Sequence, residues 1–290
     1  YRPRLSFDIS RAKELWGFGK HMFGISILRF FCVHGDDAFL GKMLGATALG
    51  FYQQAFRIGH MVTTEIGGRV AVVAFPAYSK LQDNVAKLRS GYFKAVCVTT
   101  LIVFPAAGGL IALAPEITRI AFGAKWLPMV PAMQILCLLG PLKCMQRGPV
   151  FMAMGRPDII TKISAMRLVL MVVSIYPLTV KWGMAGTSFC VLGMGLIMQP
   201  VAFYELQKLI DAKVRDVLRI LSYPLAATLL MMLCLYLVKN AMNSVGPAGL
   251  VLLVGIGAAV YSIFILLLSK ISSEYDVPAL IRDVVKGLKS

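Results

Sequence analysis

A stripe of polar side chains runs along one face of the otherwise apolar stretch between residues 48 and 76. At about 100° of rotation per helical residue, its members share a sector of about 140° that includes Arg57. They are Gln53, Gln54, Arg57, His60, Thr64 and Glu65. Such a stripe lines a water-filled cavity or forms a hydrogen-bonded seam between helices. Because an arginine and a histidine exceed what helix packing needs, we predict a cavity wall.

Three further basic residues occupy apolar stretches, namely Arg29, Lys143 and Arg147. The last two stand four residues apart and would share one face of a helix. Glu65 is the candidate counter-charge, but Arg69 follows it by four residues and can pair with it. A net positive interior favours an anionic ligand, and the planar fork of arginine suits phosphate. The sequence therefore predicts an anion-binding cavity.

Two other interpretations stay open at this point. Lys143 and Arg147 could instead extend their charged ends toward the cytoplasmic surface, as long basic side chains do near helix ends. Asp36 and Asp37 are predicted to lie in a solvated outer turn rather than in the cavity.

The sequence holds no motif for covalent chemistry. It contains no phosphate-binding loop of the GxxxxGK[ST] type, no HExxH and no GxSxG. The six cysteines form no CxxC pair and the three histidines are scattered, so neither a disulfide framework nor a metal site is indicated. We expect no enzyme activity, no cofactor and no metal.

The elements that position these residues must be membrane helices. Of the 290 residues, 58% are hydrophobic and only 15% are charged, with a mean hydropathy of +0.75. A soluble domain has about 45–50% apolar and about 25% charged residues. Hydrocarbon requires each backbone polar group to be paired within the chain. The composition excludes a soluble enzyme, a disordered chain and a fibrous repeat, and it predicts an all-α polytopic membrane protein.

About eight stretches are long enough to span a membrane, which takes about 20 apolar residues. They are roughly 14–35, 48–76, 92–114, 129–153, 159–180, 183–205, 217–238 and 247–269. An even number of spans puts both ends of the segment on one side, and most of the basic loop residues fall on that side. The positive-inside rule therefore places both ends in the cytoplasm. This topology explains most of the net charge of +16 without nucleic acid.

Three connections between these spans are distinctive. The stretch Tyr78–Lys94 is polar and is predicted to be a cytoplasmic turn. The stretch Glu116–Pro128 mixes charge with large apolar residues and is predicted to be an interfacial helix on the outer face, with Trp126 at headgroup level. The basic stretch Leu206–Arg219 divides a six-helix lobe (1–205) from two additional transmembrane helices and a cytoplasmic tail (206–290).

Four sequence blocks carry a family resemblance. They read LGATALGFYQQAFRIGHM, VVAFPAYSKLQDN, FGAKWLPMVPAMQILCLLG and AMGRPDIITK. Together they resemble Wzx-type polysaccharide flippases of the multidrug/oligosaccharidyl-lipid/polysaccharide exporter superfamily, over about residues 1–205. Members have two six-helix lobes that rock around a central cavity. The resemblance implies that this chain is the second lobe with two extra helices, and that the first lobe of the same chain is missing. The start at Tyr1 rather than Met agrees with that expectation.

The resemblance also implies a function. Such proteins flip undecaprenyl-pyrophosphate-linked oligosaccharide across the bacterial inner membrane for exopolysaccharide or lipopolysaccharide biosynthesis. The resemblance places Arg57 and the polar stripe around it on the cavity wall. It makes Arg29, Lys143 and Arg147 further candidates for binding the substrate. Expected partners are membrane lipids, the lipid-linked oligosaccharide, and a polysaccharide polymerase with its chain-length regulator. Two alternatives remain, a drug/cation antiporter of the same superfamily and a membrane scaffold that transports nothing.

Overall fold

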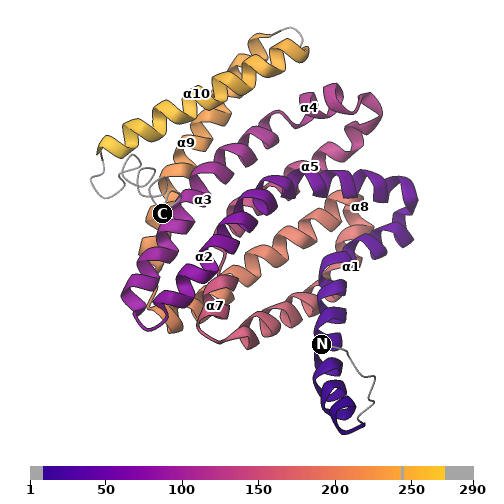
Figure 1. Ribbon diagram of the computed structural model, residues 1–290. Coiled ribbons are helices and arrows are strands. Elements are labelled where there is room, and N and C mark those ends of the chain that lie inside the picture. The colour runs from indigo at the N-terminus through magenta and orange to yellow at the C-terminus, as the bar shows by residue number, and fades with distance from the viewer. Residues whose placement is uncertain (1–8, 243–244, 272–290) are drawn as a thin grey trace, which may run out of the picture.

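The computed structural model describes residues 9–242 and 245–271, and every regular element in those ranges is a helix (Figure 1). The all-α fold predicted from composition is therefore confirmed. The predicted cytoplasmic tail beyond residue 271 and the basic lead-in before residue 9 lie outside the described residues.

The helices follow one another with short connections. The first half of the chain comprises α1 (Ile9–Val62), the π-helix η1 (Thr63–Gly67), α2 (Gly68–Leu81), α3 (Val85–Ala112), α4 (Ala114–Ala121) and the 3-10 helix η2 (Ala124–Met129). The second half comprises α5 (Val130–Cys137), α6 (Leu139–Lys143), α7 (Gly148–Ala153), α8 (Pro157–Ile210), α9 (Val214–Ala241) and α10 (Pro247–Ile271).

Two glycines fold the long helices α1 and α8 back on themselves. Gly45 has φ 85° and Gly183 has φ 57°, values that glycine adopts at little cost because it lacks a Cβ. Each long helix therefore has a first and a second arm, which are 9–44 and 46–62 in α1 and 157–182 and 184–210 in α8. These reversals separate the first two and the fifth and sixth predicted spans.

Hydrogen bonds between residues 16 apart show how closely the arms of each hairpin approach. In α1 the Tyr52 hydroxyl donates to the Asp36 carboxylate at 2.7 Å. In α8 the Ser174 hydroxyl lies 3.1 Å from the Cys190 sulfur. The two reversals are also neighbours, since a Cβ built on Gly183 would lie 3.9 Å from Leu44.

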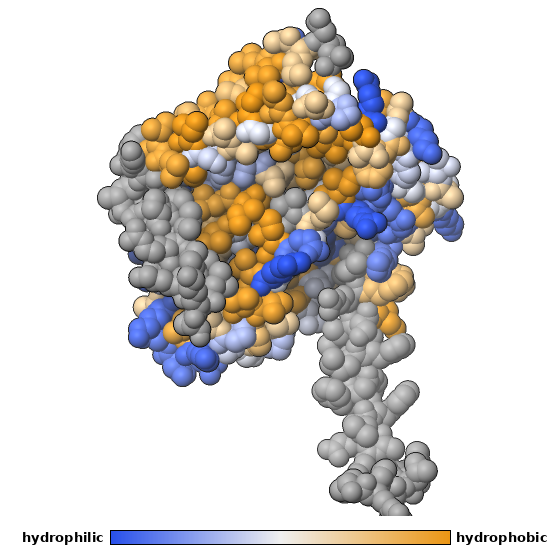
Figure 2. All heavy atoms as spheres, turned by 45° about the horizontal axis from the view of Figure 1, so that its top comes forward, coloured by the Kyte–Doolittle hydropathy of each residue, from blue (hydrophilic) through white to orange (hydrophobic). Residues whose placement is uncertain are grey.

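Within residues 9–242 and 245–271, five helical segments are long and apolar enough to cross a membrane. They are Val85–Ala112, Ala124–Ala153, Pro157–Ile210, Val214–Ala241 and Pro247–Leu268. The third is the folded helix α8 and contains two of the predicted spans. The predicted total of eight is therefore approximate, and the first two predicted spans are not among the five. Figure 2 shows a surface on which apolar residues predominate, as expected for a protein that faces lipid.

The fourth predicted span corresponds to the apolar segment Ala124–Ala153, but it is not one continuous helix. The chain forms α5, α6 and α7 in succession, with residues 144–147 between the last two. Pro131, Pro141 and Pro149 each lack a backbone N–H, and a proline inside a helix interrupts its hydrogen bonding. Lys143 and Arg147 therefore do not share a helix face as their spacing suggested.

The predicted connections are shorter than expected. Residues 82–84 alone separate α2 from α3, and the Asn84 side chain caps α3 by accepting from the Lys87 backbone N–H at 3.0 Å. Residues 211–213 separate α8 from α9. Most of the predicted polar turn Tyr78–Lys94 and of the stretch Leu206–Arg219 is therefore helical. The predicted interfacial helix is divided at Gly123 into α4 and η2.

The main core joins the second arm of α1 to α5 and α8. It is built from small and flexible buried side chains such as Ala55, Met133, Leu136 and Met194. A separate cluster packs α9 and α10 against α3, with Leu113 and Leu235 buried in it. An ion pair of 2.7 Å between Lys239 and Glu116 also ties α9 to α4. The division of the chain near residue 206 stays a prediction.

Candidate functional site

The predicted stripe on the second arm of α1 divides into an exposed and a buried part. Gln53, Arg57, Thr64 and Glu65 are exposed, together with Met61 between them, and we call these five residues the Arg57 face. Gln54 is half-buried beside it. His60 turns inward and retains only 6% of its surface. One ionic face therefore remains accessible on an apolar helix.

Two polar residues near Arg57 have side-chain partners within the chain. The Gln53 amide donates to the Asp37 carboxylate at 3.2 Å. Glu65 and Arg69 pair at 3.1 Å, which confirms the predicted pair, although both side chains are largely exposed. Among the described residues, no hydrogen bond or ion pair engages Arg57 itself. Its guanidinium is the free cation of this face.

The Arg57 face continues into the π-helix η1, which carries Thr64 and Glu65. The π-helix places Thr63 and Gly67 against the segment that links α6 and α7. A Cβ on Gly67 would collide with the side-chain amide of Gln146, and one on Gly140 would lie 3.3 Å from the Thr63 hydroxyl. Single π-turns inside long helices often occur at functional sites. Here the wider turn brings this helix into close contact with the broken span.

His60 lies on the inner side of the same helix and contacts Lys143. Its ring stacks on Phe56, with centroids 4.0 Å apart and planes 9° from parallel. The Lys143 ammonium lies 2.6 Å from the His60 Nε2 atom. Because an ammonium can only donate, the geometry requires a neutral imidazole that accepts through Nε2. This contact links α1 to the end of α6.

Lys143 also belongs to a basic cluster that the sequence only partly revealed. A pocket of about 170 Å³ lies between α6 and the two arms of α8, and its lining includes Lys143, Arg147, Arg167 and Gln199. We call the three charged ones, Lys143, Arg147 and Arg167, the basic cluster. Arg167 was missed because its position early in the fifth span placed it on the cytoplasmic side. One sequence signal did indicate that Arg167 lies within a span. A helical turn takes about 3.6 residues, so Arg167 stands nearly three turns after Pro157.

The expectation that Asp36 lies in a solvated turn was wrong. Its side chain is 5% exposed, not solvated, and the Tyr52 hydroxyl is bound to it. Its charge acts on Lys143 and so partly offsets the positive charge of the basic cluster. Asp37, one residue on, is half-buried and binds Gln53. Arg29 lies in the first arm of α1, but its side chain lies outside the described residues.

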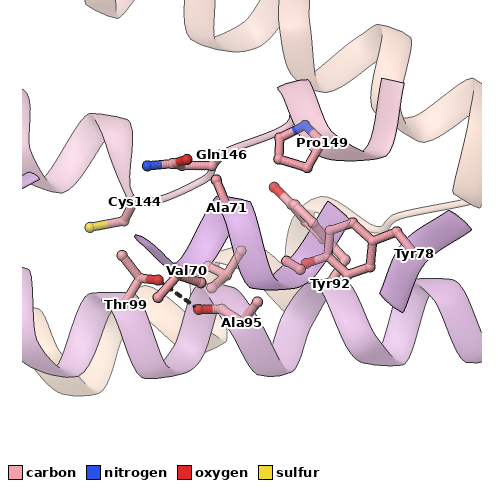
Figure 3. Close-up of a pocket in the computed structure, with 11 residues that line it drawn as sticks. Val70, Ala71, Tyr78, Tyr92, Ala95, Thr99, Cys144, Gln146 and Pro149 are labelled. Carbon is pink, nitrogen blue, oxygen red and sulfur yellow. Dashed lines mark hydrogen bonds between the residues drawn. The ribbon is translucent and has the colours of Figure 1, made fainter. Parts of the chain in front are cut away.

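A smaller cavity lies on the other side of the α6–α7 segment (Figure 3). Its volume is about 10 Å³, close to the minimum that one water needs. Figure 3 shows Gln146 and Pro149 on one side of it and the rings of Tyr78 and Tyr92 near its far end. Its size suits hydration of these polar groups rather than a ligand.

A large apolar groove begins beside the Arg57 face. It measures about 510 Å³ and is lined by α3, α9 and α10, with Met61 at its edge. Met61 follows Arg57 by one helical turn, so the cationic face and the groove adjoin. Within the described ranges, no three His, Cys, Asp or Glu residues are grouped as metal ligands would be.

Comparison with known proteins places this arrangement in a class. Residues 1–131 match a family model described as "Polysaccharide biosynthesis protein". The fold is that of a solved lipid II flippase, MurJ in an inward closed conformation, with a TM-score of 0.76, 16% identity, and coverage of 92% of this chain and 57% of that one.

Sequence relatives give a narrower result. The lipopolysaccharide biosynthesis protein WzxC of Escherichia coli (strain K12) is 30% identical over 68% of this chain and 40% of its own length. The teichuronic acid biosynthesis protein TuaB of Bacillus subtilis (strain 168) is 29% identical over 55% of this chain and 33% of its own. The predicted resemblance to the Wzx-type polysaccharide flippases is thus confirmed. The chain spans less than half the length of these relatives.

Proposed function

We propose that this chain is the second lobe, with two additional helices, of a flippase that moves undecaprenyl-pyrophosphate-linked oligosaccharide across the bacterial inner membrane for polysaccharide biosynthesis. The observation that carries the proposal is the exposed and unpaired Arg57 on an apolar helix. A lone cation at membrane depth is stable only if water or an anionic ligand reaches it. A pyrophosphate group fits the planar donor fork of the guanidinium.

The groove beside Arg57 supports a lipid-linked substrate in particular. Its lining is apolar and runs along α3, α9 and α10, where a long isoprenoid chain could lie while the headgroup stays at Arg57. Gln53, Gln54 and Thr64 add hydrogen-bonding groups for the sugar on the same side of the helix. The relatives' names, which refer to polysaccharide and lipopolysaccharide biosynthesis, support the same substrate class.

Transport in this proposal needs no covalent chemistry. The lobe faces a second six-helix lobe, and the two rock so that the site opens first to the cytoplasm and then to the outer side. Both ends of the segment 1–290 lie in the cytoplasm, and the assembly works beside a polysaccharide polymerase and a chain-length regulator. Arg29, Lys143 and Arg147 add positive charge to the lobe, although the latter two lie away from the Arg57 face.

The alternatives are not favoured. A drug/cation antiporter would need a free acidic group in the cavity, whereas Glu65 is paired with Arg69. A scaffold without transport would not need an exposed cation beside an apolar groove.

Reconstituted flipping tests the proposal. The full-length protein would be placed in liposomes with labelled lipid-linked oligosaccharide, and the rate at which the label reaches the other leaflet would be measured. Arg57→Ala should abolish flipping while expression and membrane insertion persist. Arg57→Lys should retain part of the rate, because a point charge replaces a bidentate fork.

The matched control is Arg215→Ala, which removes an exposed arginine on α9. It should flip at the wild-type rate. An Arg57→Ala protein that is as fast as the control would remove Arg57 from the substrate site and, with it, the main support for an anionic substrate.

A further inference from the structure

The basic cluster has more positive charge than the described chain neutralises. None of the ion pairs among the described residues involves Lys143, Arg147 or Arg167. Asp36 acts on Lys143, but its carboxylate already accepts the Tyr52 hydroxyl. Arg167 adds to the positive potential at Lys143 and at His60. The cluster is therefore a site of mutual repulsion.

That repulsion is not relieved by loss of protons. Lys143 could become neutral in an apolar surrounding, but a guanidinium stays protonated in proteins. Arg147 and Arg167 are thus permanent charges. Arg147 retains only 7% of its surface, so water screens it poorly. Buried charge of this kind costs several kcal/mol unless an opposite charge accompanies it.

Two buried donors of the cluster also lack acceptors. The Nε atoms of Arg147 and Arg167 are buried and have no hydrogen-bond partner among the described residues. Arg147 otherwise contacts the Met145 sulfur at 3.5 Å, the Phe203 ring at 6.0 Å and the buried Tyr92 hydroxyl, and none of these groups is a carboxylate. Buried N–H groups are nearly always paired in folded proteins. Both guanidiniums belong to the lining of one pocket, where a single acceptor could serve them.

The shape of the pocket limits what that acceptor can be. Its volume is about 170 Å³, which leaves room for several water molecules. Apart from the basic cluster its walls are apolar or lack side-chain charge, with Leu139, Leu142 and Met198 among them. Gln199 is held in place because its amide donates to the Leu142 carbonyl. A small anion fits this space.

We propose that the pocket between α6 and the two arms of α8 binds a small inorganic anion, which stays with the lobe and is distinct from the transported substrate. Chloride and phosphate share the required chemistry, since each accepts N–H donors and carries negative charge. The anion joins α6 to both arms of α8 and so holds the broken span in place. The site is separate from the Arg57 face, because Lys143 meets α1 at the buried His60 and not on its exposed side.

Anion-dependent stability tests this proposal on the 290-residue chain in nanodiscs. The thermal unfolding midpoint would be followed while gluconate, a larger organic anion, is exchanged for chloride at constant ionic strength. A second series would use phosphate. We expect a saturable rise in the midpoint with at least one of the two anions, and the more effective one identifies the resident ion.

Substitutions test whether the anion acts at this pocket. Arg167→Gln should weaken the apparent affinity about tenfold or more, since hydrogen bonds to charged groups are among the stronger ones. Arg215→Gln, which removes an exposed arginine outside the pocket, should leave the affinity unchanged. If Arg167→Gln does not fold, Arg167→Lys serves instead, and it should bind more weakly than wild type while keeping the charge.

Three results would overturn the proposal. The first is a midpoint that does not respond to either inorganic anion. The second is an equal response in wild type and in the Arg167 variants. The third is protection by undecaprenyl pyrophosphate alone, which would assign the pocket to the transported substrate. Flipping by the full-length protein and its loss in Arg57→Ala are separate measurements, so failure here leaves the proposed function standing.

Discussion

The Lys143 ammonium and the His60 imidazole are joined at 2.6 Å although 83 positions separate them in the chain. The contact connects α1, which carries Arg57 on its exposed side, to α6, which carries part of the basic cluster. A change at either residue therefore reaches both the surface that carries Arg57 and the pocket behind it.

A double-mutant cycle measures this contact. Lys143→Met removes the charge at similar length, and His60→Phe keeps the stacking on Phe56. We expect a favourable coupling energy of about 1 kcal/mol or more in unfolding free energy, because each single variant leaves a polar atom unpaired. Thermal or denaturant unfolding in detergent provides the four values. Additive single effects would show that the pair contributes no stability.

Close packing at the reversal of α8 yields a second prediction. A Cβ on Gly186 would collide with the backbone carbonyl of Leu178 across the hairpin, whereas one on Gly193 would meet nothing within 4 Å. Both glycines lie in the second arm of α8. Gly186→Ala should lower the unfolding midpoint strongly, because backbone cannot move aside as a side-chain end can.

Gly193→Ala is the matched control and should be neutral or slightly stabilising, since alanine favours helix by about 1 kcal/mol over glycine. Similar midpoints for the two variants would mean that the arms of α8 are farther apart than described.

Membrane topology can be tested with single cysteines at exposed positions. Lys125 and Lys181 are predicted to lie outside, and Arg156 and Lys213 in the cytoplasm. In intact cells, an impermeant thiol reagent should label Lys125→Cys and Lys181→Cys but not the other two. Four of the five described native cysteines are buried, which favours a low background. Labelling of Lys213→Cys from outside would overturn the even number of spans.

The division near residue 206 predicts the result of a deletion. If α9 and α10 are an addition to a complete lobe, removal of residues 211–290 from the full-length protein should leave measurable flipping. The contacts of α9 with α3, including buried Leu113 and Leu235, would be replaced by lipid, which is itself apolar. Total loss of flipping in a well-inserted protein would show that these helices belong to the transport unit.

Composition and periodicity were sufficient to predict the class of protein and the exposed part of the candidate site. Arg57 could be predicted because a single helix places it among polar neighbours, and helical geometry is local. The Glu65–Arg69 pair followed from the same rule. Separation of adjacent spans could be anticipated near Gly45 and Gly183 because each interrupts a long apolar stretch.

The inner cluster could not be predicted in this way. Lys143 and Arg147 do lie together, but around a break between two helices and not on one helical face. Arg167 joins them through the tertiary packing of α8, which a local sequence pattern does not reveal. Asp36 was misjudged for a related reason, since its burial depends on Tyr52, which the reversal at Gly45 brings back to it. Long-range contacts decide these three cases.

The adjoining reversals at Gly45 and Gly183 have a consequence for how the protein meets its surroundings. Each connects two helices with one residue outside helical geometry, so neither leaves an extended strand of backbone. A protease needs several residues in extended form to cleave, and many antibodies recognise protruding loops. This corner of the molecule should therefore resist limited digestion and be poorly antigenic, while the connection at residues 211–213 is the more accessible point of attack.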